Sequence, residues 1–288
     1  MPVSPDLPTF AADIAPHVDR LFIAGHHAAR PFARLIAAEF GIRSFGLLID
    51  LRRPLLCPGG ISAAEVEFIN RYYMPQDLSA SLQAHVLEGL LWRDNAFYLP
   101  TSLGKAVLQR LTQGLSSGLS QEWTDAGRIS TASALAENVV QEAASTYDAA
   151  SAPAFSAQRP DCPPADQTPS FRLWDRLLLL RYLRADCHAN TWKEAGLDAP
   201  RAGVLDAFWH AAGPLVVTGH LNRNNPPLLS LQERGWVSRQ DETWLLTAEG
   251  RAIRERIEEQ TNAAAGRAFG VLDEVERDAL LASLSSLP

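Results

Sequence analysis

Two stretches of the sequence decide the fold prediction. Residues 89–107 read GLLWRDNAFYLPTSLGKAV and residues 235–253 read GWVSRQDETWLLTAEGRAI. Without any gap, Gly89 aligns with Gly235 at an offset of 146 positions. A second glycine pair and matching Arg, aromatic, Leu and Thr positions keep the same offset. This agreement predicts an internal duplication, with one structural module in each half of the chain.

Each stretch has the pattern of a helix end, a two-stranded wing and a new helix. A leading glycine is typical of a helix C-cap, because glycine adopts the left-handed conformation without a Cβ clash. Polar RDN and RQDE between apolar runs predict hairpin turns, and Thr101 and Thr247 then stand at N-cap positions. Ser62 and Glu65 have capping-box spacing, which predicts a helix upstream of the first wing. We therefore predict a mainly α protein with small β wings, built as tandem winged-helix (helix-turn-helix) modules in a pseudo-twofold arrangement.

The segment between the two copies predicts the domain boundaries. A helix is expected near residues 130–147, and five prolines between positions 153 and 169 are expected to prevent regular structure after it. The predicted domains are a first winged-helix module at residues 1–115, a connecting helix and Pro-rich linker at residues 116–169, and a second module at residues 170–288.

The composition predicts a soluble globular protein of the cytoplasm. Of its 288 residues 47% are hydrophobic and 20% are charged, and no apolar run approaches the roughly 20 residues that span a bilayer. The first ten residues lack the pattern of a secretory signal. Cys57, Cys162 and Cys187 share no CxxC spacing, so we expect reduced thiols and neither a disulfide framework nor a zinc ribbon.

Beyond the two copies, shorter stretches carry a family resemblance. The duplicated stretches resemble the MarR-like winged-helix superfamily. The stretches HAARPF, INRYYMP, LWDRLLLLRYLRADCHANTW and RIEEQTN resemble, more narrowly, a poorly characterised actinobacterial-type family with two helix-turn-helix modules per chain. That family has a His five residues before an aromatic, and His27 and Phe32 match this spacing. It also has an Arg-Gly-Asp-Gly-His stretch, to which Arg184, Asp186 and His188 correspond. The resemblance implies the fold and leaves the function open.

The leading functional hypothesis is a protein that binds a small ligand in a cleft between its modules. Imidazole is a common ligand of transition metals and of haem, so His27 and His188 are candidate metal ligands if the modules bring them together. A planar or metal-containing ligand such as haem would then also need polar and aromatic contacts. The candidate ligand-binding residues are His27, Arg184, Asp186, His188, Tyr72 and Trp192.

Two alternatives remain open. The first is a transcriptional regulator that binds DNA through Arg223, Arg234 and Arg239 of the second module. A net charge of −7 disfavours DNA contact, as does the first recognition helix, residues 75–89, which has no Arg or Lys. The weaker alternative is an enzyme in which His27 or His188 acts as an acid or base.

Overall fold

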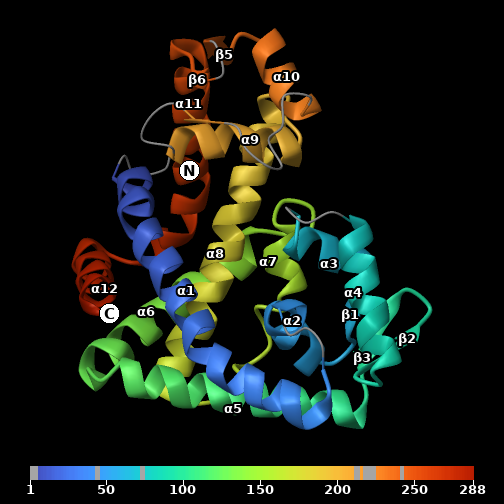
Figure 1. Cartoon of the computed structure of the whole chain (residues 1–288). Helices are drawn as coiled ribbons and strands as arrows, with labels where there is room; N and C mark the ends of the chain where they lie inside the picture. The colour runs from blue at the N-terminus through green and yellow to red at the C-terminus, as the bar shows by residue number, and fades with distance from the viewer. Residues whose placement is uncertain (1–5, 43–45, 72–74, 211–214, 217–224, 241–242) are drawn as a thin grey trace. The chain divides into compact units, whose positions relative to one another are not determined.

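The chain is mainly helical, with two small antiparallel sheets (Figure 1), as the sequence predicts. The computed structural model describes residues 6–42, 46–71, 75–210, 215–216, 225–240 and 243–288. No helix in these ranges combines the length and the apolar character needed to cross a membrane. The helices are α1 (Leu7–Phe40), α2 (Gly46–Leu56), α3 (Ala63–Ile69), α4 (Pro75–Leu87), α5 (Ser102–Glu122), α6 (Ala126–Thr146), α7 (Pro153–Ala157), α8 (Pro169–Glu194), α9 (Ala199–His210), α10 (Pro226–Glu233), α11 (Ala248–Gly266), the 3-10 helix η1 (Arg267–Val271) and α12 (Glu274–Ser286). The strands are β1 (Ile61–Ser62), β2 (Leu91–Asp94), β3 (Phe97–Pro100), β4 (Leu215–Val216), β5 (Val237–Gln240) and β6 (Thr243–Leu246).

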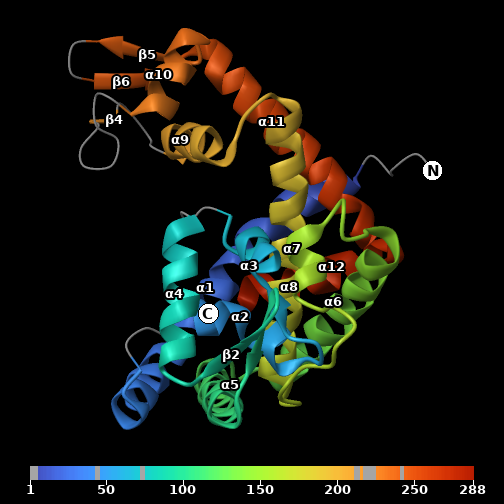
Figure 2. The same ribbon diagram turned by 90° about the vertical axis from the view of Figure 1, so that its right-hand side faces the viewer.

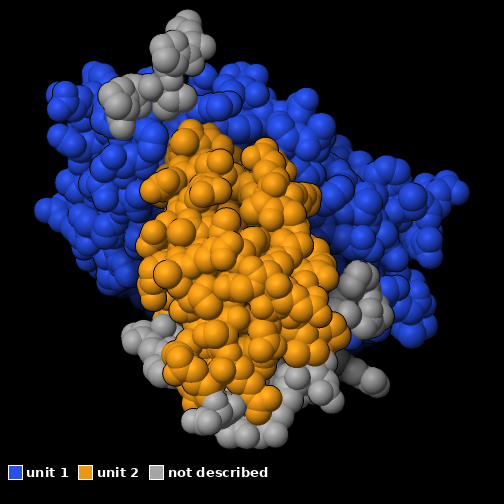
Figure 3. All heavy atoms as spheres, turned by 90° about the horizontal axis from the view of Figure 1, so that it is seen from above, with its two compact units in different colours: residues 1–186, 265–288 blue, residues 187–264 orange. Residues whose placement is uncertain are grey.

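The chain folds into two compact units, coloured separately in Figure 3. The first unit contains residues 1–186 and 265–288, and the second contains residues 187–264. The division falls inside α8 and α11, so each of these helices contributes residues to both units. The domain ranges 1–115, 116–169 and 170–288 come from the sequence repeat and the Pro-rich segment, and they stay a prediction.

The predicted connecting helix is present as α6, but the Pro-rich segment is not wholly irregular. Pro153 begins α7 and Pro169 begins α8. Proline is tolerated in the first turn of a helix, where its missing N–H has no intrahelical partner to lose. Only the stretch between these two helices lacks regular structure, as the prolines predict.

In the first unit, α1 packs along α5 (Figure 1). A valine and four leucines of α5 are buried: Val107, Leu108, Leu111, Leu115 and Leu119. The two helices approach closely at Gly118, where an added Cβ would lie 2.9 Å from the carbonyl oxygen of Ala28. A larger residue there would separate the two helices.

Each unit holds one three-stranded sheet with the same topology. The strand order is β1-β3-β2 in the first unit and β4-β6-β5 in the second. In the hairpins, Arg93 pairs with Tyr98 and Arg239 with Trp244. Figure 2 shows the second hairpin beside α10. The apolar members of both pairs are buried, so each hairpin is anchored by an aromatic side chain at the same register position.

The predicted caps are present on both sides of each hairpin. Gly89 and Gly235 have φ values of 72° and 75°, the left-handed conformation expected of the glycine that ends a helix. Thr101 Oγ1 donates to the Gly89 carbonyl at 2.7 Å, and Thr247 Oγ1 donates to the Gly235 carbonyl, also at 2.7 Å. Each threonine also caps its helix by accepting a backbone N–H at 3.0 Å, from Gly104 and from Gly250.

Two of the three cysteines form a disulfide, and the expectation of three reduced thiols was therefore wrong. Cys57 is joined to Cys162, whereas Cys187 is buried and lies outside the disulfide. The bonded residues lie 105 positions apart, one directly after α2 and the other between α7 and α8. No spacing motif reveals such a pair, because only the folded chain brings its members together.

Candidate functional site

The second unit presents helix α10 and the β5–β6 hairpin as its candidate functional surface. Asn225 caps α10 by accepting the N–H of Leu228 at 3.2 Å, and two prolines occupy the first turn. Leu228 and Leu231 are buried in the apolar core of this unit, together with Leu205 and Phe208 of α9. The opposite side of α10 exposes the side chains of Leu229, Gln232 and Glu233.

Two of the three predicted DNA-contacting arginines belong to this surface, and Arg223 lies outside the described residues. Arg234 follows α10 as its C-cap, donates from Nη2 to the Gly196 carbonyl at 2.9 Å, and holds its guanidinium 5.1 Å from the Trp236 ring centroid. Arg239 lies on β5 with its side chain exposed. The surface thus combines one arginine fixed at the helix end with one on the hairpin.

The corresponding helix of the first unit, α4, differs in charge. It contains no Arg or Lys, and its exposed residues are polar, apolar or acidic: Asp77, Ser79, Ala80, Gln83 and Leu87. A phosphate backbone would meet no cation on this helix. The exposed side chains of α4 are therefore uncharged or acidic.

The first hairpin exposes two large aromatic side chains on its outward face, and the second hairpin has polar residues at the same positions. Trp92 is 46% exposed and Phe97 is 43% exposed. The same register positions of β5 and β6 hold Ser238 and Thr243. The two hairpins therefore share their backbone geometry and differ in surface chemistry.

The predicted ligand residues in the first unit have different environments. His27 is exposed on α1, and Arg184 is half-buried on α8. The carboxylate of Asp186 is fully buried, forms an ion pair with Arg71 and accepts the backbone N–H of Phe155 at 2.8 Å. Burial raises the pKa of Asp186, although the nearby Arg71 acts to lower it. Its oxygens are therefore used within the protein.

The predicted ligand residues in the second unit also bond within the protein. His188 Nδ1 lies 3.2 Å from the hydroxyl of Thr261, and Trp192 is part of the apolar core. Tyr72 lies outside the described residues. His27 and His188 belong to different units, so their meeting stays a prediction. In the part of the chain that the structure describes, no group of three or more His, Cys, Asp and Glu is placed to hold a metal ion.

Sequence reasoning missed a buried charge cluster in the first unit. Asp175 of α8 is 1% exposed and forms an ion pair with Arg53 of α2. The guanidinium of Arg52 lies 3.5 Å from the same carboxylate and 5.0 Å from the rings of Phe171 and Trp174. Burial lowers the pKa of Arg52 to about 10. Adjacent arginines in an apolar helix are a weak signal, because their partner lies about 120 residues away.

His26, which has no role in the sequence analysis, lies at the edge of this cluster. Its Nε2 is 3.7 Å from Asp50 Oδ1, and its ring packs edge-on against Phe22 with 4.4 Å between centroids. Burial lowers the pKa of His26 to about 4, aided by Arg181, and burial raises the pKa of Asp50 to about 6. At neutral pH the imidazole of His26 is therefore uncharged. The carboxylate of Asp50 is ionised, and its ionisation lowers the stability of the folded state.

Comparison with known proteins identifies the family. A model described as a helix-turn-helix family matches residues 96–287, which are two thirds of the chain. The chain belongs to this helix-turn-helix family. No curated protein matches the chain, and no solved structure matches it.

The family match covers the second unit of this helix-turn-helix protein completely and the first unit only in part. It contains all of residues 187–264, hence α9, α10 and the β5–β6 hairpin. It begins only at residue 96, after α3 and α4 and inside the first hairpin. The helix-turn-helix family is therefore matched over the whole second unit, but not over α4.

Proposed function

We propose that this protein is a DNA-binding transcriptional regulator that contacts DNA through its second unit. The observation that carries the proposal is the family match, which spans the whole second unit and leaves out α4. The exposed Arg239 supports it, because arginine on a hairpin is suited to a phosphate contact. DNA is then the partner, and the cytoplasm is the proposed compartment.

The proposal extends to the fold. We infer two MarR-like winged-helix modules that arose by internal duplication. The equal strand orders support this inference, as do the two threonine caps with the same hydrogen bonds. The pseudo-twofold arrangement of the modules remains part of the proposal.

In this mechanism α10 enters the major groove, and the hairpin follows the backbone beside it. Residues 187–264 contain eight Arg and Lys but ten Asp and Glu, so the unit as a whole does not attract DNA. Affinity must come from local contacts. If Arg223, Arg234 and Arg239 each neutralise one phosphate, the slope of log K against log salt is about −2.7.

A matched pair of substitutions tests the proposal. Arg239 and Arg93 occupy the same register position in the two hairpins. A duplex is first selected from random sequences with the full chain, and binding is then measured by fluorescence anisotropy at several salt concentrations. Arg239→Gln should weaken binding and reduce the salt slope by about 1, whereas Arg93→Gln should change neither. Equal effects of the two substitutions, or no effect of either, would contradict the proposal.

The small-ligand hypothesis has less support from the described contacts. Asp186 and His188 already bond to protein groups, and Trp192 lies in an apolar core. These contacts leave the assigned residues with ordinary structural roles. A visible spectrum of freshly purified protein tests the haem version directly, because bound haem absorbs strongly and its band should disappear in His188→Ala. A general acid or base role for His27 or His188 stays a prediction.

A further inference from the structure

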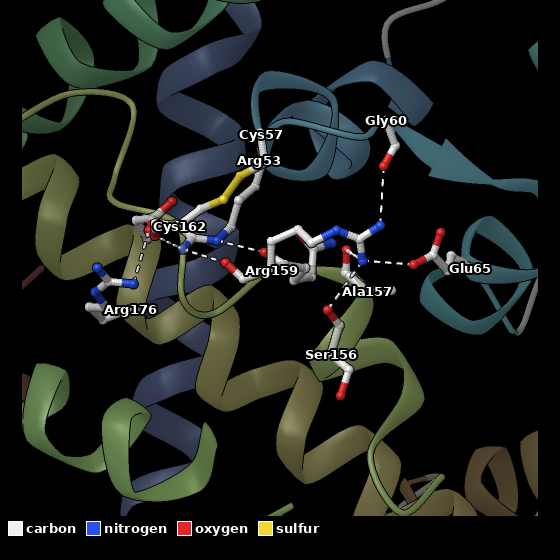
Figure 4. The surroundings of a disulfide bond; sticks show 11 residues. Arg53, Cys57, Gly60, Glu65, Ser156, Ala157, Arg159, Cys162 and Arg176 are labelled. Atoms are coloured by element: carbon white, nitrogen blue, oxygen red, sulfur yellow. Dashed lines mark hydrogen bonds and ion pairs between the residues drawn. A yellow bond between two sulfur atoms is a disulfide. The ribbon is translucent and has the colours of Figure 1, made fainter. Parts of the chain in front are cut away.

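The Cys57–Cys162 disulfide joins the end of α2 to a turn that follows α7 (Figure 4). Cys57 directly follows α2, and the backbone N–H of Cys162 donates to the carbonyl of Arg159 at 2.9 Å. Arg159 has a φ of 54°, which non-glycine residues rarely adopt. Residues 158–162 therefore form a turn whose backbone conformation depends on the contacts around it.

Arg159 connects this turn to strand β1 and helix α3. Its Nη1 donates to Glu65 Oε1 at 2.7 Å, and its Nη2 donates to the carbonyl of Gly60 at 3.1 Å. Glu65 at the same time completes the capping box of α3, because its Oε2 accepts the backbone N–H of Ser62 at 2.8 Å. Figure 4 shows Glu65 beside Arg159 of the turn. The same carboxylate therefore caps α3 and holds the turn.

Arg53 holds the turn from the side of α2. Its Nε donates to the Gln158 carbonyl at 2.7 Å, and its Nη2 donates to the Arg159 carbonyl at 3.0 Å and to the Cys162 carbonyl. Three backbone carbonyls of the turn therefore depend on one guanidinium four residues before Cys57. The disulfide adds a covalent link between the same two segments.

We propose that this disulfide is a reversible redox switch that controls how firmly residues 158–162 hold β1 and α3. A dithiol reductant breaks the S–S bond, supplies two electrons and two protons to form the Cys57 and Cys162 thiols, and becomes a disulfide itself. Neither cysteine is fully buried, so a thiolate can reach the sulfurs. Reduction removes the covalent link and leaves the turn held by the hydrogen bonds of Arg53, Gln158 and Arg159.

The expected compartment favours a switch over a permanent crosslink. Disulfides are rare where thiol reductants predominate, and those that occur there are usually catalytic or redox-sensing. This step rests on the proposed function, since a DNA-binding regulator works beside DNA in such a compartment. The contacts that Arg53 and Arg159 make in the turn do not depend on the proposed function.

The test measures thiols and backbone exchange on the full-length protein. The oxidised protein is treated with dithiothreitol under native conditions, its free thiols are alkylated and counted by mass spectrometry, and amide hydrogen exchange is measured in both states. We expect two additional thiols, and exchange in residues 57–66 and 156–162 that is faster by roughly tenfold. Exchange in α9 and α10 should not change.

Variants separate the switch from general loosening. Cys57→Ser and Cys162→Ser should exchange like reduced protein under oxidising conditions. Cys187→Ser, which alters the buried cysteine outside the disulfide, should respond as the unmodified chain does. A disulfide that resists dithiothreitol in the folded protein would overturn the proposal. Reduction of the disulfide without faster exchange in the two segments would also overturn the proposal. This outcome can be measured on the unmodified protein. Because neither readout involves DNA, failure of the switch is distinguishable from failure of the proposed function.

Discussion

Replacing Asp50 by Asn should remove a cost to folding that appears only when the carboxylate is ionised. The side chain is 21% exposed, and burial raises its pKa from 3.8 to about 6 although Arg181 and Arg52 act to lower it. An acid whose pKa is higher in the folded state stabilises the fold when protonated. That contribution is lost as the pH rises from 3.8 through 6.

The magnitude follows from the two pKa values. Their difference corresponds to about 3 kcal/mol of unfolding free energy once the pH is well above 6. About 1.6 kcal/mol of this is already lost at pH 5, so about 1.4 kcal/mol remains to be lost between pH 5 and pH 8. The Asn variant lacks this titration. Its unfolding free energy relative to the unmodified protein should therefore rise by about 1.4 kcal/mol over that interval.

Urea unfolding at pH 5 and pH 8 measures this change. His26, whose pKa is lowered to about 4, acts in the opposite direction: its contribution is lost as the pH falls from 6.5 through 4. Because both proteins contain His26, its contribution cancels in the comparison. Asp19→Asn is the matched control, since Asp19 pairs with Arg181 as an exposed carboxylate and surface ion pairs contribute little. An Asp50→Asn difference that is the same at both pH values, or that falls between them, would refute the reasoning.

Three further predictions concern stability. Thr247→Ala removes the cap of α11 and should lower the unfolding free energy by about 1 kcal/mol in urea titrations. Gly250→Ala would place a Cβ 2.0 Å from the carbonyl oxygen of Trp236, so the hairpin must move. We expect a loss of about 3 kcal/mol, and a thermal midpoint equal to that of the unmodified protein would contradict this contact. Arg53→Met leaves the buried Asp175 without its closest cation and should cost about 3 to 5 kcal/mol by calorimetry, whereas a neutral result would mean that Arg52 compensates.

Local chemistry made the hairpins and their flanking helices predictable. A glycine that ends a helix and a threonine that begins the next act within a few residues, so Gly89, Thr101 and their second-copy counterparts are recognisable in the sequence. The capping box at Ser62 and Glu65 is equally local, and it is present in the structure. Signals of this range determine where elements begin and end.

The features that sequence reasoning missed all depend on distant partners. The partners of Arg53, Cys57 and His26 in the charge cluster and the disulfide come from other elements of the fold. Nothing in the neighbouring residues indicates which side chain each will meet. The adjacent histidines of α1 show the limit, since His26 is held by its surroundings and His27 is exposed.

The contrast between the two hairpins also has a practical use. Exposed Trp92 and Phe97 make the first hairpin a candidate for nonspecific association at the concentrations used for crystallisation or NMR. The chain itself supplies polar residues that the same backbone register accepts, Ser238 and Thr243. The double substitution Trp92→Ser and Phe97→Thr should therefore reduce nonspecific association, because both replacements already occur at the same positions of the second hairpin.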